Sequence, residues 1–490
     1  MKRRVAILMM LAWLPRIGAA QNNTTDPGLV GVLVTHKQQN PYLPWKSGKS
    51  ASRSGYGILI SSNRVLTTEH LVRNHTLVEI RRPREGEKIA ATVEIADHRL
   101  NLAILQVEIG IAPSLSRLPL SPRCNVDDKV TVYQIDSDND IQAVEATVSR
   151  IGVSNLPNAP YSLLTYQLLS DLNIRHEGAP VVKNGSLMGI VMSYESGTRI
   201  AFVISHPFVP RFVEDATTLP YKGPASAGFI WRALLDPAKR HYLGVADTDG
   251  GIQVISAIKG TPSGDVLRSS DVILTWGGHA LDNLGYYEDD DYGRLELSHL
   301  VKGRGSPGDI VPVTIVRDGK TMEIDLVLSG DLDPLGLVPE NAIAERAEYL
   351  VEAGFILREL DVFFMRARGG DWQSKVDSRL LHFHHSGSGP DHEPGDRVVI
   401  LMGVIPDPIN EGYHNFRNEV ITTVNGQPVR NMKDVFRIAD KQGTLHRFTL
   451  YGTDIELVLD KHKIEDANRR LSERYRIPSL RFERNPPSVP

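Results

Sequence analysis

Short hydrophobic runs separated by turn residues fill the chain from residue 28 to about residue 213. Examples are "LVGVLVTH", "SGYGILISS", "LAILQVE", "DKVTVYQI" and "AVEATVSRIG", all rich in Val, Ile and Leu. Side chains of this kind pack well on a pleated surface, and many short strands at regular spacing are typical of paired antiparallel barrels or a sandwich. The first 200 residues are therefore predicted to be mainly β.

Two further units are expected after a linker, "LPYKGPASAG" at 219–228. The first, about 229–329, closes with "PGDIVPVTIVRDGKTMEIDLVL", a hairpin with Asp318-Gly319 at its turn. The second, about 342–459, contains "EVITTVNGQPVRNMKDVFRIA", a hairpin at Asn425-Gly426 followed by a helix. Both units have the order strand, turn, helix, which makes them a weak internal repeat. The charged tail after Lys461 is predicted to be helical until Pro478 and loose beyond it.

Composition is that of a globular, core-forming protein. The chain has 490 residues, of which 41% are hydrophobic and 23% charged, and its formal net charge is −4. At roughly 150 residues per domain, this length predicts about three domains. A near-neutral chain without clustered Lys and Arg is a poor match for nucleic acid, because phosphate binding needs such clusters.

The N-terminus has the pattern of a signal peptide, residues 1–20. Three basic residues precede the apolar run "VAILMMLAWL", and "GAA" offers small residues before a cleavage site after Ala20. The alternative is an uncleaved anchor. No other run of 18 apolar residues follows, so the mature form is predicted to lack a membrane span. Cys124 is the only cysteine, which excludes an internal disulfide and suits a bacterial periplasm. We expect a protein that is exported, periplasmic or extracellular.

Several segments, in collinear order, resemble HtrA/Deg serine proteases. "SGYGILISSNRVLTTEHLV" is similar to the family's segment around the catalytic histidine, and "HRLNLAILQVE" to the segment around the aspartate. "NIRHEGAPVVKNGSLMGIV" resembles the nucleophile loop, and "HYLGV" a PDZ carboxylate-binding loop. The region "VILMGVIPDPINEGYHNFRNEVITTVNGQPVRNM" and the tail "RRLSERYRIPS" resemble the plant and fungal Deg branch.

This resemblance implies a mainly β fold, a trypsin-like double β-barrel followed by two PDZ-like domains. The implied boundaries are 21–218 for a degenerate protease domain of two six-stranded barrels, 226–332 for the first PDZ domain, 342–462 for a divergent second PDZ-like domain, and 463–490 for the C-terminal tail.

The expected catalytic residues are where the chain departs from the family. Matched by position, His70 takes the place of the base, Asn101 that of the carboxylate, and Glu177 that of the nucleophilic serine. An amide in place of the aspartate can cost about 10⁴ in turnover in a serine protease. In the oxyanion loop, Arg175 replaces the family's first glycine, and Ala179 replaces the second glycine of a pair. None of these positions is therefore expected to be catalytically functional.

Three alternatives stay open at this site. Ser170 or Ser186 could serve as a substitute nucleophile, although neither aligns with His70. His70 could be an ordinary buried histidine in a chain that shares only the fold. Glu177 and His70 could form an ion pair that fills the cleft.

Peptide binding is the function that the resemblance leaves intact. A PDZ domain adds an extended peptide to a strand and holds its carboxylate with loop amides. The loop is expected at Tyr242, Leu243, Gly244 and Val245, and Leu300 is expected to line the groove from a helix. The alternative is a structural PDZ that packs against its neighbour. In the second PDZ-like unit, "EAGFILREL" replaces the simple loop, which favours docking over peptide binding.

Two polar clusters are expected to be solvated loops. "HFHHSGSGPDHEPGD" holds several histidines near acids, but its spacing is irregular; "YYEDDDYG" lacks a Ca²⁺-loop pattern. No metal and no cofactor are therefore predicted.

These expectations lead to three hypotheses. The first is an exported pseudoprotease that binds unfolded or C-terminal peptides, or serves as a non-catalytic partner of active Deg/HtrA proteases in protein quality control. The second is a serine-type endopeptidase with residual activity. The third is a structural scaffold of an oligomer. A homo-oligomer is the expected assembly, and native mass measurement would separate the third hypothesis from a monomeric binder.

Overall fold

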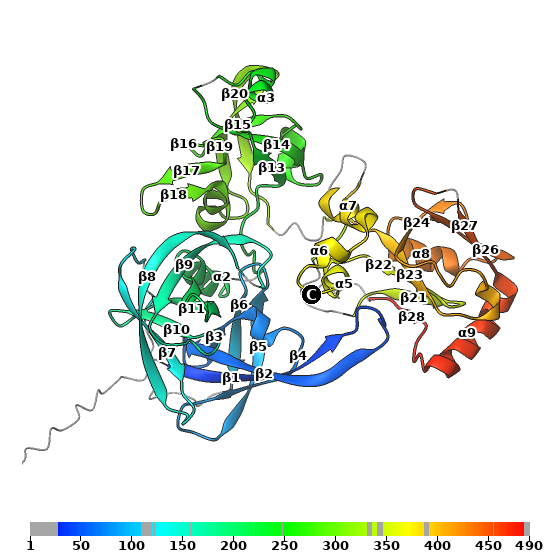
Figure 1. Cartoon of the computed structure of the whole chain (residues 1–490), viewed down its shortest axis with the longest axis horizontal. Helices are drawn as coiled ribbons and strands as arrows, with labels where there is room; N and C mark the ends of the chain where they lie inside the picture. The colour runs from blue at the N-terminus through cyan, green and yellow to red at the C-terminus, as the bar shows by residue number, and fades with distance from the viewer. Residues whose placement is uncertain are drawn as a thin grey trace, which may run out of the picture.

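The chain folds into two β-barrels and two further β-rich units (Figure 1). A computed structural model describes residues 28–108, 119–120, 123–156, 158–218, 220–246, 248–330, 336–340, 346–386, 392–453 and 455–484. The predicted signal peptide lies outside these residues. None of the described helices has both the length and the apolar character needed to cross a membrane.

The first barrel is closed by six antiparallel strands in the order β1-β2-β3-β6-β5-β4. Val30, Val32 and Val34 alternate into its core along β1, as the hydrophobic runs predict. A single helical turn, α1, follows β3 directly. The elements are β1 (Leu29–Gln39), β2 (Ser47–Leu59), β3 (Arg64–Thr67), α1 (Glu69–Val72), β4 (His75–Arg81), β5 (Lys88–Asp97) and β6 (Leu102–Val107).

The second barrel is closed in the order β10-β11-β12-β9-β8-β7, and helix α2 follows its last strand. The two closed six-stranded barrels confirm the predicted trypsin-like double barrel. The elements are β7 (Lys129–Ile135), β8 (Ile141–Asn155), β9 (Ser162–Ser170), β10 (Pro180–Lys183), β11 (Ser186–Glu195), β12 (Ile200–Ile204) and α2 (Phe208–Asp215).

The next unit is a sheet of order β13-β14-β15-β19-β20 with a separate β17–β18 hairpin. Asp318 and Gly319 have φ of 50° and 72° and form the predicted turn between β19 and β20. The elements are β13 (Phe229–Ala233), α3 (Pro237–Leu243), β14 (Ile252–Ala257), α4 (Pro262–Val266), β15 (Val272–Trp276), β16 (His279–Ala280), β17 (Tyr286–Asp289), β18 (Gly293–Glu296), the π-helix η1 (His299–Arg304), β19 (Ile310–Arg317) and β20 (Lys320–Val327).

Helix η1 packs on the second barrel. The Arg211 guanidinium on α2 donates to the carbonyl oxygens of Lys302, Gly303 and Gly305, at the end of η1. The Tyr166 hydroxyl on β9 donates to the hydroxyl of Tyr292. The first PDZ-like unit is therefore fixed to the protease-like barrels through its helix.

The last unit is one sheet in the order β27-β26-β24-β23-β22-β21-β28. Asn425 and Gly426 adopt φ of 53° and 71° at the predicted hairpin turn, and helix α8 follows. The elements are β21 (Tyr349–Glu352), β22 (Phe355–Glu359), α5 (Val362–Arg366), α6 (Trp372–Lys375), α7 (Ser378–Ser386), β23 (Val399–Val404), η3 (Pro408–Asn410), β24 (Glu419–Val424), β25 (Gln427–Pro428), α8 (Met432–Ala439), β26 (Leu445–Leu450), β27 (Glu456–Asp460), α9 (Lys461–Tyr475) and β28 (Arg481–Phe482).

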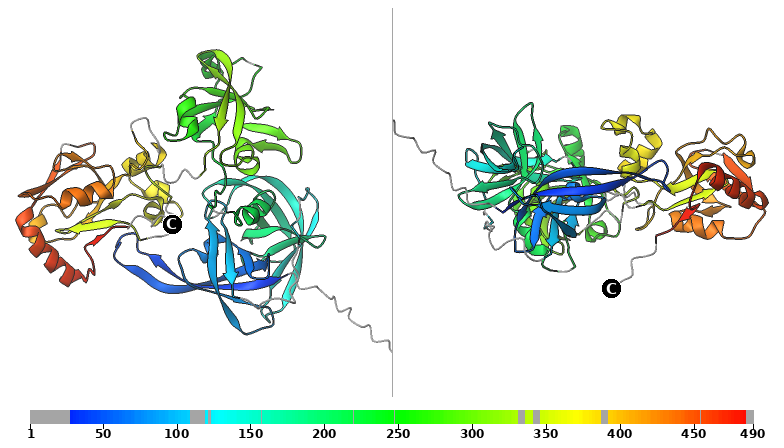
Figure 2. Two further views of the ribbon diagram at one scale, coloured as in Figure 1. Left: turned by 180° about the vertical axis from the view of Figure 1, so that it is seen from behind. Right: turned by 90° about the horizontal axis from the view of Figure 1, so that it is seen from below.

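A long arm formed by β1 and β2 reaches from the first barrel to this last unit (Figures 1 and 2). At its tip, the Tyr42 ring meets Phe364 edge to face, and the carbonyl oxygen of Pro41 accepts a hydrogen bond from Arg358. The arm therefore connects the first barrel to the last unit.

Three local expectations are wrong. The histidine-rich segment is helical at its start, since α7 carries His382, His384 and His385. The acidic segment "YYEDDDYG" forms the β17–β18 hairpin with Asp289 buried, because that carboxylate accepts hydrogen bonds from Tyr287 and Arg304. The described part of the tail beyond Pro478, residues 479–484, is not loose, because Arg481 and Phe482 form strand β28 on β21.

Candidate functional site between the two barrels

The three triad positions meet in the cleft between the barrels. His70 lies on α1, Asn101 in the turn between β5 and β6, and Glu177 in the loop before β10. Asn101 has φ of 53°, a left-handed conformation that asparagine tolerates better than most residues. The structure therefore brings together the residues that the sequence motifs singled out.

Glu177 binds the ring of His70. Its Oε1 lies 3.0 Å from Nδ1 of His70, and its Oε2 accepts a 2.8 Å hydrogen bond from the Thr68 hydroxyl. The side chains are 33% and 19% exposed for His70 and Glu177 respectively. The carboxylate thus uses both oxygens within the cleft, and it holds the nitrogen that a triad aspartate would hold.

Asn101 contacts the backbone of α1 instead of the imidazole. Its Oδ1 accepts a 2.7 Å hydrogen bond from the backbone N–H of His70, and its backbone carbonyl accepts from Glu69. Asn101 is fully buried, and its Nδ2 has no hydrogen-bond partner among the described residues. This amide therefore anchors the helical turn and leaves the orientation of the ring to Glu177.

The oxyanion loop has one of its expected donors already engaged. The backbone N–H of Arg175 donates to Oε1 of Gln134 at 3.0 Å, and the amide nitrogen of Gln134 is held by Gln142. An oxyanion hole requires free N–H groups aimed at the reacting oxygen. Gln134 comes from β7, 41 residues away in sequence, so no local motif signals it.

Glycine is required at position 178 in the same loop. Gly178 has φ of 80°, and a Cβ there would lie 1.9 Å from the carbonyl oxygen of Tyr56. Its N–H donates to Val191, while the N–H of Tyr56 donates to the carbonyl of Glu177. The loop is therefore fixed between both barrels even though its side-chain chemistry differs from the family's.

The two serines considered as substitutes lie at the end of β9 and at the start of β11. The Ser170 hydroxyl donates to the carbonyl of Leu172 at the end of β9, and Ser186 begins β11 next to a hairpin turn. Within the described residues, the hydroxyl that bonds to the His70–Glu177 pair is that of Thr68.

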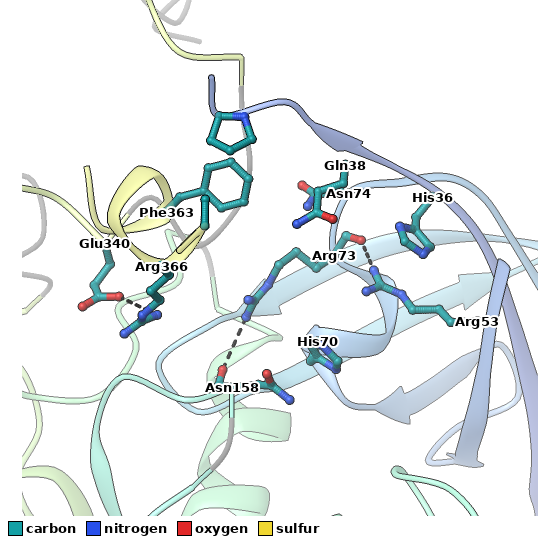
Figure 3. A pocket seen from close by; sticks show the side chains of 12 residues that line it. His36, Gln38, Arg53, His70, Arg73, Asn74, Asn158, Glu340, Phe363 and Arg366 are labelled. Atoms are coloured by element: carbon teal, nitrogen blue, oxygen red, sulfur yellow. Dashed lines mark hydrogen bonds and ion pairs between the residues drawn. The ribbon is translucent and has the colours of Figure 1, made fainter. Parts of the chain in front are cut away.

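A cavity of about 340 Å³ opens beside His70 (Figure 3). Residues of the β1–β2 arm form one wall and helix α5 of the last unit forms the opposite wall, so the cleft is partly covered. The lining residues are His36, Gln38, Pro41, Arg53, His70, Arg73, Asn74, Asn158, Glu340, Phe363, Arg366 and Ala367.

Cationic groups shape this cavity. The Arg53 guanidinium donates to the carbonyl oxygens of Leu71 and Arg73. Burial lowers the pKa of the Arg53 guanidinium, and burial followed by the nearby charge of Arg53 lowers the pKa of His36. Both effects disfavour the charged form of His36, in a pocket whose lining includes three arginines.

The described residues contain no group of three or more His, Cys, Asp or Glu side chains placed to hold a metal ion. Burial raises the pKa of the Cys124 thiol to about 11, which keeps the sulfur protonated and unreactive.

Comparisons with known proteins agree with this geometry. Residues 55–190 match the model of a trypsin-like peptidase domain, and residues 338–483 match that of a PDZ domain. Protease Do-like 2, chloroplastic, of Arabidopsis thaliana is 25% identical over 470 residues, covering 92% of this chain and 74% of that protein. Protease Do-like 4, mitochondrial, of the same plant is 22% identical over 484 residues, covering 94% and 87%. The chain is a Deg/HtrA-like protease homologue.

A solved structure supports the fold of this Deg/HtrA homologue. The structure of a variant of the HtrA-type protease AlgW with a decapeptide matches this chain with a TM-score of 0.50 at 18% identity. The match covers 62% of this chain and 94% of that chain. At this identity the likeness establishes the fold alone.

The carboxylate-binding loop of the first PDZ-like unit is not where the sequence placed it. Tyr242 and Leu243 end helix α3, and Gly244 is its left-handed C-cap with φ of 75°. The helix begins at Asp236, which caps it, and Pro237, which suits the first helical position. Those two residues are a helix start signal that outweighs the short "HYLGV" pattern.

The five expected peptide-binding residues also do not converge. Gly244 packs on the β19–β20 turn, since a Cβ there would lie 2.5 Å from Cα of Gly319. Val245 is buried, and Leu300 is buried on η1, the helix whose end is bonded by Arg211 of the second barrel. Peptide binding by this unit of the Deg/HtrA homologue stays a prediction, but these five residues do not form a single groove for it.

Strand β13 is the better candidate to receive a peptide. It pairs with β14 on one side, and its other edge has no strand partner among those described. Gly228, with φ of 72°, stands directly before it. The sequence signal is "SAGFI" at 226–230, small residues and a glycine ahead of an apolar strand.

Proposed function

We propose that this Deg/HtrA homologue is a pseudoprotease that binds peptides without cutting them. The observation that carries the proposal is the contact of Glu177 with the imidazole of His70. A serine protease needs a hydroxyl at this place to attack the scissile carbonyl. Glu177 instead supplies an acceptor to the imidazole, and the neighbouring Arg175 N–H is bonded to Gln134.

A second candidate is residual hydrolysis, and one observation favours it. A carboxylate on Nδ1 of His70 is the arrangement that orients a general base, so the pair could activate a water molecule. This route lacks a covalent intermediate, and with one oxyanion donor engaged by Gln134 it would proceed slowly.

Digestion of casein by the purified full-length chain tests both candidates. We expect no activity above that of His70→Ala, which removes the imidazole and serves as the matched control. Activity that disappears in His70→Ala would establish residual hydrolysis and reject the pseudoprotease.

Restoring the triad residue types sharpens the test. Glu177→Ser with Asn101→Asp is expected to stay nearly inert, because Arg175 and Gln134 still occupy the oxyanion loop. Adding Arg175→Gly and Ala179→Gly is expected to give weak activity. Robust proteolysis by the double variant alone would show that the loop never limited the chemistry.

Peptide binding is proposed at the free edge of β13, where an extended peptide adds as a strand. Affinity in the micromolar range, on the order of −7 to −8 kcal/mol, is expected for peptides with apolar C-termini. Ile230 on β13 is 40% exposed and Ile255 on β14 is 37% exposed, so Ile230→Asp should weaken binding and Ile255→Asp should not. Equal binding of amidated and free-acid peptides would exclude recognition of a terminal carboxylate.

Location and partners complete the proposal. The signal-peptide pattern supports export to a periplasm or the extracellular space, which N-terminal sequencing of the mature protein tests. Its relatives carry names that place them in chloroplasts, mitochondria and a periplasm. Assembly as a homo-oligomer, or with active Deg/HtrA proteases, is proposed by analogy. Native mass measurement of the chain, alone and mixed with an active relative, tests it.

A further inference from the structure

The C-terminal tail occupies an edge of the last sheet. Strand β28 pairs antiparallel with β21, in the register Tyr349 with Phe482 and Leu350 with Arg481. The Val351 N–H donates to the carbonyl of Leu480 at 2.6 Å, and the Tyr349 hydroxyl donates to the carbonyl of Ser479 at 2.8 Å. β28 is thus a short added strand, which is how sheet edges receive extended peptides.

Helix α8 supplies side-chain contacts to the same segment. The Arg481 guanidinium lies 4.4 Å from the centre of the Phe436 ring on α8. It also bonds both carboxylate oxygens of Asp440, at the C-cap of α8, at 2.8 and 3.0 Å. Strand β21 and helix α8 therefore both contact β28, and α8 supplies one polar recognition point, an aromatic face next to a carboxylate.

Apolar contacts flank that recognition point on both sides. The Phe482 ring stacks on Tyr349 and lies under the Arg346 guanidinium. Leu480 packs at the edge of the unit's core. The site accordingly fits a segment with the pattern apolar–Arg–aromatic. It binds an internal part of a chain and not a C-terminus, because the described chain continues past Phe482 to Arg484.

The bound tail is held loosely. Its strand has two residues, and the charged pair is open to water, with side chains 35% and 63% exposed for Arg481 and Asp440. Leu480 and helix α9 border a cavity of about 430 Å³, so the tail segment is not packed closely on that side. A short strand with an exposed ion pair is the kind of contact that opens locally while the rest of the fold stays intact.

We propose that β21 and α8 form a binding groove for an extended protein segment with an arginine between two apolar residues. Residues 480–482 are the resident ligand of this groove, and a segment of another protein chain with the same pattern displaces them. The proposal is independent of whether the barrel cleft is catalytic, and it gives the last unit a recognition role beyond docking.

The test uses the full-length chain with Arg481→Glu, which sets two carboxylates against each other in the groove and releases the tail. Arg469→Glu on α9 is the matched control: it breaks the exposed pair with Asp466 and, although Arg469 lines the cavity beside Leu480, it leaves the Arg481–Asp440 pair in place. Hydrogen exchange at the Val351 amide reports release, expected to be about tenfold faster in Arg481→Glu alone.

A fluorescein-labelled peptide, PSLRFER, copied from residues 478–484, then measures binding by anisotropy. We expect micromolar affinity for the Arg481→Glu chain and at least about tenfold weaker binding to the unchanged and Arg469→Glu chains, where the tail competes. A peptide with Glu in place of Arg should bind only after Asp440→Arg is combined with deletion of residues 478–490.

Three results would overturn the proposal. One is equal binding of the peptide to the Arg481→Glu and Arg469→Glu chains. Another is no binding to Arg481→Glu when exchange at Val351 shows that the tail has left. If Arg481→Glu does not release the tail, the chain ending at Ile477 replaces it as host. If that chain fails to fold or to bind the peptide, the tail is an integral strand of the sheet and the proposal is wrong.

Discussion

The protein holds two of its own segments against neighbouring surfaces, and it does so by different means. Asp289, whose side chain is fully buried, joins the β17–β18 hairpin to helix η1 through Tyr287 and Arg304. The two elements meet the second barrel through Tyr292 and Arg211. Strand β28 lies on β21 through Arg481 and Asp440, a pair open to solvent. Because a buried charge that loses its partners is costly while an exposed pair contributes little, the hairpin and η1 resist separation, whereas the contact of β28 is exchangeable.

This contrast assigns different tasks to the two PDZ-like units. In the first unit, helix η1 is bonded to the barrel, and one edge of β13 pairs with no described strand. The last unit keeps α8 accessible but has its edge strand β21 covered by the tail. The first unit therefore offers a sheet edge to a peptide, whereas in the last unit the protein's own tail occupies the corresponding edge.

Removal of the central buried carboxylate should have the largest effect. Asp289 accepts hydrogen bonds from Tyr287, Arg304 and the backbone of Asp291 and Tyr292. Asp289→Ala is expected to lower the free energy of unfolding of this unit by about 3–5 kcal/mol, because several buried donors lose their acceptor. Denaturant unfolding measures it, with Asp290→Ala, an exposed neighbour, as the control. An equal loss of unfolding free energy in both variants would show that the buried network does not stabilise this unit.

Acid should weaken the same contact. Burial lowers the pKa of His299 from 6.5 to about 4, with Asp289 opposing the shift and Arg304 and His206 adding to it. Between those two values the unfolded chain binds a proton that the folded chain does not, so stability falls as pH falls, by up to about 1.4 kcal/mol per pH unit. The slope of unfolding free energy against pH from 6.5 to 4 should be shallower in His299→Gln. An unchanged slope would mean that His299 does not titrate in this way.

Much of the fold and half of the site follow from the sequence. The barrels are visible because their strands are short runs bounded by turns, and the Asp318-Gly319 and Asn425-Gly426 turns are local signals. His70 and Glu177 meet as expected because their motifs lie next to barrel strands, His70 just after β3 and Glu177 just before β10.

The rest depends on partners that lie far away in sequence. Gln134 reaches the N–H of Arg175 across 41 residues, and β28 pairs with a strand about 130 residues before it, so neither has a local signature. The loop expected at residues 242–245 was wrong for the opposite reason, because a local helix start at Asp236-Pro237 prevails over a five-residue resemblance.

Loss of the clamp on η1 should have an intermediate effect. Arg211→Ala removes a guanidinium that donates to Lys302, Gly303, Gly305 and Ser306, at the end of the helix. We expect a loss of about 1–3 kcal/mol, since hydrogen bonds from a charged group are worth that much. The radius of gyration from solution scattering should rise as the first PDZ-like unit leaves the barrel. A lower unfolding free energy with an unchanged radius would show that Arg211 stabilises η1 without docking it.

The smallest effect on stability should come from Asp440→Ala at the exchangeable contact. Arg481 keeps its place over Phe436 and its pairing with Glu483, so the free energy of unfolding should change by less than about 1 kcal/mol. The tail should nevertheless open more often, and limited trypsin digestion should cut after Arg481 or Arg484 several times faster than in the unchanged chain. Asp466→Ala, which breaks a more exposed pair on α9, should leave that cleavage rate unaltered. If Asp440→Ala instead costs as much as Arg211→Ala, the tail is a structural strand, and the two self-contacts are alike.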